Sequence, residues 1–175
     1  NFILEEKINF KLELSVIAIG NGTQIIFYPP VQNTHKESIL RETIYPAKIS
    51  EKLVIDSLRI SKAISEKLNL NGVLAIEMFV NKKDEILVNE LAPRPHNSGH
   101  WTIDGCQFSQ FDSLVSVIKS GELKDPKPFR SCKMINLIGN DYLNYKKLKK
   151  KFKLYDYNKE EIRENRKMGH YIVFD

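Results

Sequence analysis

The sequence predicts an α+β fold, because hairpin-like pairs of β-rich segments are interspersed with two amphipathic helical patterns and no internal repeat is present. Of the 175 residues, 42% are hydrophobic and 28% are charged. These are the proportions of a soluble globular chain and exclude collagen, a coiled-coil rod and wholesale disorder. The longest apolar runs, such as residues 73–76, are too short to cross a bilayer.

The first elements are predicted to be strands. Residues 10–19 alternate in polarity, Asn21-Gly22 is a typical tight-turn pair, and residues 23–28 are again rich in β-formers, which together predict a hairpin. A further strand is expected over residues 39–45, and Pro46 closes it.

The first helix is predicted over residues 51–68. Ser50 can cap its amino end, and its apolar stripe consists of Leu53, Ile60 and Ile64. The pair Asn71-Gly72 is expected to stop it.

A second hairpin and a second helix follow. Residues 73–80 and 85–91 read as strands joined by a polar turn, and residues 93–105 read as a long loop. Ser109 and Asp112 resemble a capping box, and Gly121 marks the end of the helix behind it. Its inward side chains are expected to be Leu114, Val115 and Ile118.

The last part of the chain is predicted to be β-rich. A linker-like segment over residues 124–128 leads to a strand around residues 134–138, and further strands are expected near residues 153–157 and 168–174. Between them, residues 146–153 hold six lysines, which contribute to the net charge of +5 and the pI of about 9.1. Such a run is either a solvated face or a patch for nucleic acid or membrane, and no aromatic stacking motif accompanies it.

The cysteines and the start of the chain indicate context. Cys106 and Cys132 are far apart and in no metal-like spacing, which favours a reducing, cytoplasmic compartment over a structural zinc site. The chain begins at Asn1 and continues with apolar and acidic residues, unlike a signal or transit peptide. We therefore expect it to be a fragment or a trimmed chain.

Two acidic residues interrupt the apolar strands of the second hairpin. If its turn is centred between Lys83 and Asp84, Glu77 and Glu90 are directly opposed, with Cβ atoms roughly 5 Å apart. Two carboxylates at this separation repel each other, so either one of them is protonated or a cation lies between them. Oxygen ligands on a rigid sheet suit Mg²⁺. The alternative is a register shifted by one residue, in which one of the two side chains points to solvent.

The loop after this hairpin concentrates polar groups. Arg94 lies between two prolines, which hold the backbone extended and present the guanidinium as a clamp for phosphate or carboxylate. His96, Asn97 and His100 add hydrogen-bonding groups within a few residues, so this loop is predicted to be functional rather than structural.

The segment NELAPRPHNSGHW, residues 89–101, resembles the signature of the N5-carboxyaminoimidazole ribonucleotide synthetases, a family of ATP-grasp enzymes of purine biosynthesis. The resemblance extends in order over essentially the whole chain: EEKINFKLELS (residues 5–15) is similar to the family's hinge, and further matches occur at residues 28–35, 109–111, 134–139 and 166–170. It implies the C-terminal lobe of an ATP-grasp fold over residues 1–124, followed over 125–175 by the start of a small β-rich C-terminal domain.

The resemblance also implies an activity and its residues. Such enzymes use ATP to convert bicarbonate to carboxyphosphate and pass the carboxyl group to 5-aminoimidazole ribonucleotide. Glu77 and Glu90 match the two Mg²⁺ ligands, and Arg94 matches the catalytic arginine at bicarbonate or carboxyphosphate. The residues that match the family's ATP contacts are Glu5, Glu6, Lys7, Ile8, Glu13, His35, Asn89 and Glu90. Residues matching the ribonucleotide site are His96, Asn97 and His100, and those matching its phosphate site are Lys159 and Arg166.

Three positions depart from what the resemblance leads one to expect. Ala92 stands where many ATP-grasp proteins have a metal-binding Asn, Tyr155 where the family has His, and Asn165 where a glycine is expected before Arg166. No Gly-rich phosphate loop occurs. The chain is thus expected to hold the metal and acceptor half of the site without its lid, and to be inactive alone.

The expected partners are aminoimidazole ribonucleotide and bicarbonate, with ATP and Mg²⁺ as cofactors and a homodimer as the assembly to test. Neither nucleic acid nor membrane is expected as a partner. The alternatives are a related ATP-grasp enzyme, such as the formate-dependent glycinamide ribonucleotide transformylase, a non-catalytic nucleotide-binding remnant, or nucleic-acid binding through the lysine run. Retention of both Glu77 and Glu90 argues against the remnant.

Overall fold

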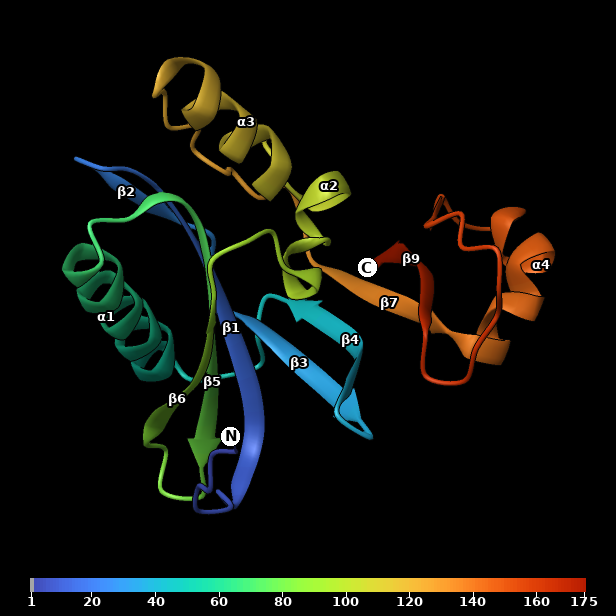
Figure 1. The fold of residues 1–175 in the computed structure, drawn as a ribbon, viewed down its shortest axis with the longest axis horizontal. Coiled ribbons are helices and arrows are strands. Elements are labelled where there is room, and N and C mark those ends of the chain that lie inside the picture. The colour runs from blue at the N-terminus through green and yellow to red at the C-terminus, as the bar shows by residue number, and fades with distance from the viewer. Residues whose placement is uncertain (1) are drawn as a thin grey trace.

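Residues 2–175, which the computed structural model describes, form one nine-stranded sheet with few helices (Figure 1). The strand order is β6-β5-β1-β3-β4-β7-β9-β8, β2 pairs with β1 outside this path, and every pairing is antiparallel. The α+β fold class predicted from the sequence is confirmed. The elements are β1 Phe10–Asn21, β2 Ile25–Phe27, β3 Val31–Lys36, β4 Ile39–Tyr45, α1 Glu51–Lys67, β5 Asn71–Asn81, β6 Ile86–Ala92, η1 Asn97–Gly99, α2 Thr102–Gly105, α3 Gln110–Ser120, β7 Cys132–Ile138, η2 Gly139–Asn144, α4 Tyr145–Lys149, β8 Leu154–Asp156 and β9 Lys167–Phe174.

The long strands β1 and β5 have two different faces. One face is apolar and packs on α1, through residues such as Leu14, Val16 and Ile76. The other face changes along its length: Ile17 and Ala75 lie in the core that includes Trp101, Cys106 and Val117, while the positions beyond them carry polar side chains. Helices thus cover only part of this face (Figure 1), and the polar remainder is where the candidate site lies.

Helix α1 begins as predicted, since the Ser50 hydroxyl accepts a hydrogen bond from the Leu53 amide at 3.4 Å. Its buried face differs from the predicted stripe and consists of Leu53, Ser57, Ser61 and Ser65, whereas Ile60 and Ile64 are only partly buried. The serines are small, and Ser61 donates to the carbonyl of Ser57 in its own helix, so no polar group of this pair is left unpaired against the sheet. The predicted stop at Asn71-Gly72 is wrong, because the helix ends at Lys67 and those residues begin β5.

Helix α3 has the predicted capping box between Ser109 and Asp112, and Gly121 ends it in the left-handed conformation at φ 70°. Leu114 packs on the core, but the expectation for Val115 and Ile118 is wrong, because they are 52% and 74% exposed. The buried residues of this helix are Gln110, Ser113 and Val117. Polar side chains face inward here because they hydrogen-bond to the loop before the helix and to Tyr28.

The remaining differences concern short elements. Strand β3 was not predicted, and the long loop after β6 contains the short helices η1 and α2. The lysine run lies on and after α4, where residues 146, 147, 149, 150 and 151 are exposed or nearly so, consistent with a solvated face. Within residues 2–175, no helix is long and apolar enough to span a membrane.

Candidate active site

Three adjacent strands place acidic side chains on the polar part of the sheet face. Across β1, β5 and β6, Ser15 pairs with Glu77, and Glu77 pairs with Glu90. One step along β1, Glu13 lies on the same face, and its carboxylate is 2.8 Å from Nδ1 of His35 on β3. These strands line an open cavity of about 480 Å³ whose walls are Phe10, Glu13, His35, Ser38, Glu77, Phe79, Asn89 and Glu90.

The opposition of Glu77 and Glu90 is confirmed, although by a different route from the predicted one. Nearer the turn, Met78 pairs with Val88, so the hairpin is centred on Lys83 rather than between Lys83 and Asp84. A β-bulge at Asn89 then inserts one residue into β6 and brings Glu90 opposite Glu77. The bulge also places Asn89 itself in the wall of the cavity.

The electrostatics of the pair favour a cation. Burial raises the pKa of the Glu77 carboxyl above its ordinary value, and the carboxylates of Glu90 and Glu13 raise it further. His35 and Lys167 act in the opposite direction but do not cancel the rise. A divalent ion between Glu77 and Glu90 would relieve this repulsion. No cluster of three or more His, Cys, Asp or Glu side chains able to hold a metal occurs in residues 2–175. The pair therefore fits Mg²⁺, which takes one or two protein carboxylates together with water and phosphate oxygens, better than it fits a metal enclosed by protein ligands.

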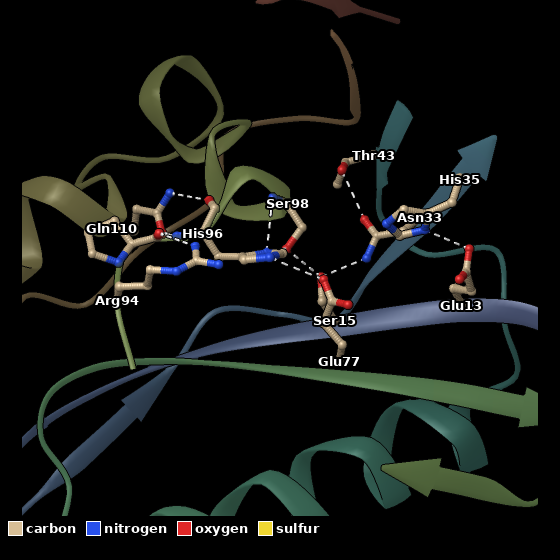
Figure 2. A network of polar contacts seen from close by, with 11 residues as sticks. Glu13, Ser15, Asn33, His35, Thr43, Glu77, Arg94, His96, Ser98 and Gln110 are labelled. Carbon is tan, nitrogen blue, oxygen red and sulfur yellow. Dashed lines mark hydrogen bonds and ion pairs between the residues drawn. The ribbon is translucent and has the colours of Figure 1, made fainter. Parts of the chain in front are cut away.

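The loop after β6 brings a histidine and an arginine to this pair (Figure 2). Nε2 of His96 is 3.2 Å from a carboxylate oxygen of Glu77, and both side chains are largely buried. Arg94 runs beside His96, and its Nη1 donates to the carbonyl of Pro95 at 3.2 Å. Burial and then the charge of Arg94 lower the pKa of His96 to about 4, so this imidazole is neutral at neutral pH.

Gln110 holds this loop in place. Its side-chain oxygen accepts from the His96 amide at 3.0 Å, and its side-chain nitrogen donates to the His96 carbonyl at 2.8 Å. Gly99 is required beside it, because a Cβ atom there would lie 2.7 Å from the Gln110 side chain. The motif Ser109-Gln110-Phe111 thus has a structural task, which is to fix the backbone that carries His96.

Replacing Gln110 with Ala is therefore expected to destabilise the chain by about 2–4 kcal/mol, since it leaves the His96 amide without its acceptor and opens a cavity. Urea unfolding would measure the change. The control is Gln107→Ala in the same segment, where the side chain is exposed, and it should change stability by less than about 0.5 kcal/mol. Equal effects of the two substitutions would contradict the proposal that Gln110 holds the backbone of the His96 loop.

Comparison with known proteins agrees with this geometry. Residues 1–111 match the model of the ATP-grasp domain, and residues 132–175 match that of the phosphoribosylaminoimidazole carboxylase C-terminal domain. The chain belongs to the ATP-grasp family. The resemblance to N5-carboxyaminoimidazole ribonucleotide synthetases is also confirmed, as the curated and solved relatives with that name match nearly the whole chain.

Three relatives illustrate the match. The N5-carboxyaminoimidazole ribonucleotide synthase of Bacillus subtilis is 40% identical over 96% of this chain and 45% of its own length. The crystal structure of the Staphylococcus aureus synthetase complexed with ADP has a TM-score of 0.91 at 34% identity, covering 98% of this chain and 48% of that one. The Aspergillus clavatus enzyme in complex with ADP and 5-aminoimidazole ribonucleotide has a TM-score of 0.89 at 29% identity, covering 95% and 47%. The chain thus spans about half the length of the relatives that it matches.

A second cluster lies behind the loop of this ATP-grasp chain. The Tyr157 hydroxyl is 3.0 Å from Nδ1 of His100 and 2.9 Å from Nδ1 of His170. Burial lowers the pKa of His100 to about 3 and that of His170 to about 4. Tyr155, which departs from the family pattern, stacks on His170 at a centroid distance of 4.7 Å and donates to Asp104 at 2.8 Å. An aromatic hydroxyl thus links β8 to α2 at this position.

The other residues predicted for the site lie outside the cavity near Glu77 and Glu90. Glu5, Glu6 and Lys7 are exposed and Ile8 is half-buried in an irregular segment outside the walls of the cavity. Asn97 begins η1, and its Oδ1 is buried without a hydrogen-bond partner within residues 2–175.

Lys159 and Arg166 both precede β9 in the chain. The Lys159 amine lies 5.7 Å from the Tyr157 ring centroid, and Arg166 donates to the carbonyl of Glu161. The residue before Arg166, Asn165, has φ 65°, the left-handed region that a glycine would adopt and that Asn tolerates.

Lys167 is a site residue that sequence reasoning missed. Burial lowers its pKa, the cations Arg94 and Lys159 lower it further, and the Glu77 carboxylate opposes them. Lys167 therefore lies within electrostatic reach of both the Glu77 and the Arg94 parts of the site, although it is more than seventy positions away from them in the sequence. Its place directly after Arg166 in the motif of residues 166–170 was the signal that could have found it.

Proposed function

We propose that this chain is the metal- and acceptor-binding half of an ATP-dependent ligase that carboxylates 5-aminoimidazole ribonucleotide with bicarbonate to give N5-carboxyaminoimidazole ribonucleotide, in de novo purine biosynthesis. The observation that carries the proposal is the facing pair Glu77 and Glu90, with His96 3.2 Å from Glu77 and Arg94 beside His96. The names of the relatives support the same reaction.

In the proposed reaction, an oxygen of bicarbonate attacks the γ-phosphorus of ATP, and the bond from that phosphorus to the β,γ-bridging oxygen breaks. ADP and carboxyphosphate result. The amine of the ribonucleotide then attacks the carboxyl carbon, phosphate leaves with the electrons of the carbon–oxygen bond, and the nitrogen loses a proton. Each step concentrates negative charge on oxygen, which fixed cations stabilise.

The residues divide between the two substrates. Mg²⁺ held by Glu77 and Glu90 would neutralise charge on the ATP phosphates. Arg94 presents a bidentate fork to bicarbonate or carboxyphosphate, and Lys167 adds a second cation on the same side. Nucleotide contacts are proposed for Glu13, His35 and Asn89 in the cavity wall and for the hinge Glu5, Glu6, Lys7 and Ile8.

The acceptor side lies on the other flank of Arg94. Asn97, His96 and His100 lie on or beside η1 and are proposed to form the ribonucleotide side of the site. Lys159 and Arg166 are proposed to bind the ribonucleotide phosphate as two cations near the start of β9.

The proposal also covers the organisation of the chain. Residues 1–124 would form the ATP-grasp lobe and residues 125–175 the start of the C-terminal domain, a boundary that lies between the two family matches. A cytoplasmic location is proposed, consistent with free and buried Cys106 and Cys132. A homodimer is proposed as the assembly.

The proposal is tested with a chimera in which this chain replaces the corresponding part of the Bacillus subtilis protein. ADP release is expected to require both bicarbonate and aminoimidazole ribonucleotide, and the 175-residue chain alone is expected to release none. ADP release that does not depend on the ribonucleotide would overturn the acceptor assignment. Turnover by the chain alone would overturn the need for a separate phosphate-covering lobe.

A further inference from the structure

A continuous row of buried hydrogen bonds runs from the core of the sheet to the candidate site (Figure 2). The Thr43 hydroxyl on β4 donates to Asn33 on β3 at 2.9 Å, and the Asn33 amide nitrogen donates to the Ser15 hydroxyl on β1 at 2.9 Å. Ser15 donates to the Ser98 hydroxyl at 2.8 Å, and Ser98 lies 2.8 Å from Nδ1 of His96. We call this row the relay; it consists of Thr43, Asn33, Ser15, Ser98 and His96.

The relay has a single direction. Because Ser98 accepts from Ser15, its own hydroxyl hydrogen is left for Nδ1 of His96. The backbone amide of Ser98, which can only donate, also points to Nδ1 at 3.3 Å. Both donors require Nδ1 to be an acceptor, so in the neutral imidazole the hydrogen must be on Nε2, the nitrogen 3.2 Å from Glu77.

Burial makes this arrangement difficult to reverse. Thr43, Ser15 and Ser98 are 0% exposed and Asn33 is 4% exposed, so water cannot replace a lost partner. Reversing the relay would leave the Ser98 amide pointing at an N–H group, a buried donor without an acceptor. The sheet holds the row in register, because Asn33 pairs directly with Thr43, and Ser15 pairs directly with Glu77.

We propose that Ser98, Ser15 and Asn33 are positioning residues that hold His96 in its Nε2–H tautomer. In this tautomer, His96 presents a hydrogen-bond donor to the side of the cavity that carries Glu77, and it has no free lone pair there with which to remove a proton. His96 is thus a donor that orients the metal-binding carboxylate, and the proton lost by the acceptor amine goes elsewhere. The consequence for turnover rests on the proposed function, whereas the tautomer itself does not.

The tautomer is measured directly by long-range ¹H–¹⁵N correlation spectra of the ¹⁵N-histidine-labelled 175-residue chain at neutral pH. The chain has four histidines, so each ring can be assigned by its own substitution. His96 is expected to show only the Nε2–H form. In Ser98→Ala, Nδ1 loses its hydroxyl donor, and a mixture of both tautomers is expected. The Nδ1–H form in the unsubstituted chain would overturn the proposal, as would an unchanged His96 spectrum in Ser98→Ala.

The matched control is Ser61→Ala, the same substitution at an equally buried serine whose hydroxyl donates only to its own helix. It should leave the His96 spectrum unchanged. If Ser98→Ala does not fold, Ser15→Ala decides the question, because it removes the donor to Ser98 without touching His96. The expected result is a smaller shift toward the Nδ1–H form, and no shift would overturn the proposal.

Turnover adds an independent reading in the chimera. Loss of a hydrogen-bonding group behind a metal ligand typically lowers metal affinity or activity by about 10–100-fold. Ser98→Ala is therefore expected to raise the Mg²⁺ concentration needed for half-maximal turnover by about 10-fold, without a change in the KM for ribonucleotide. A chimera without any activity would contradict the proposed function, but it would leave the spectroscopic result intact.

Discussion

Replacing Glu77 with Gln is expected to lower ADP release by the chimera about 10³-fold, which corresponds to the loss of several kcal/mol of metal-dependent charge stabilisation. The amide keeps the shape of the side chain but cannot offer a charged oxygen to a divalent ion. Glu90→Gln is expected to have a similar effect, because the two carboxylates face each other across β5 and β6.

The measurement is the rate of ADP release as a function of Mg²⁺ concentration. Glu85→Gln is the matched control, since Glu85 belongs to the same hairpin but lies outside the cavity wall and contacts Asn81. It should retain full activity. A Glu77→Gln protein with normal turnover would mean that the facing pair does not hold the metal.

The same substitution should stabilise the free chain. Burial raises the pKa of Glu77, so its ionised form is disfavoured in the folded state at neutral pH. Gln removes that charge, and a gain of about 1 kcal/mol in the free energy of unfolding is expected. Loss of activity combined with a gain in stability is typical of a functional residue and is not expected of a structural one.

Acidification is expected to unfold the chain well above the range in which carboxylates titrate. His96, His100 and His170 have pKa values of about 4, 3 and 4 in the folded state, because burial disfavours their charged forms. The unfolded chain binds protons at these residues near pH 6.5, and the folded chain does not. Stability is therefore complete above pH 6.5 and decreases as the pH falls toward 4, by about 1.4 kcal/mol per pH unit for each histidine.

Urea unfolding at a series of pH values between 7 and 4.5 measures this slope. Glu77 acts in the opposite direction, because its raised pKa makes the fold bind a proton earlier than the unfolded chain. The net slope is thus smaller than that of three histidines. Replacing His170 with Gln should reduce the number of protons bound on unfolding by about one. A flat profile from pH 7 to 4.5 would contradict the burial of these rings.

Much of the local structure could be predicted from the sequence. The Ser50 cap, the capping box of Ser109 and Asp112, and the left-handed Gly121 are each decided by groups within a few residues of one another. The acidic pair was predicted for a related reason, since a charge inside an apolar strand is visible in the chain itself. The resemblance to the family was also carried by contiguous motifs.

Other features were not predictable because they depend on partners distant in the sequence. The inward face of α1 carries three serines, whereas hydrophobicity alone pointed to Ile60 and Ile64, which are only partly buried. Val115 and Ile118 were assigned to the core on apolar character, but the helix faces inward with residues that bind the loop. The turn of the second hairpin was predicted one half-residue away from its actual centre. The bulge at Asn89 shifts the register, so that Glu77 and Glu90 are nevertheless opposed.

The available groups can be identified from short stretches of the chain: two carboxylates, a guanidinium between prolines and a cluster of imidazoles. How these groups act together depends on the fold. It brought Lys167 within electrostatic reach of Arg94 and Glu77, and it aligned Thr43, Asn33, Ser15 and Ser98 behind His96. This is because hydrogen-bond direction and the free energy of a buried charge depend on neighbours in space, which strand pairing selects from distant parts of the chain.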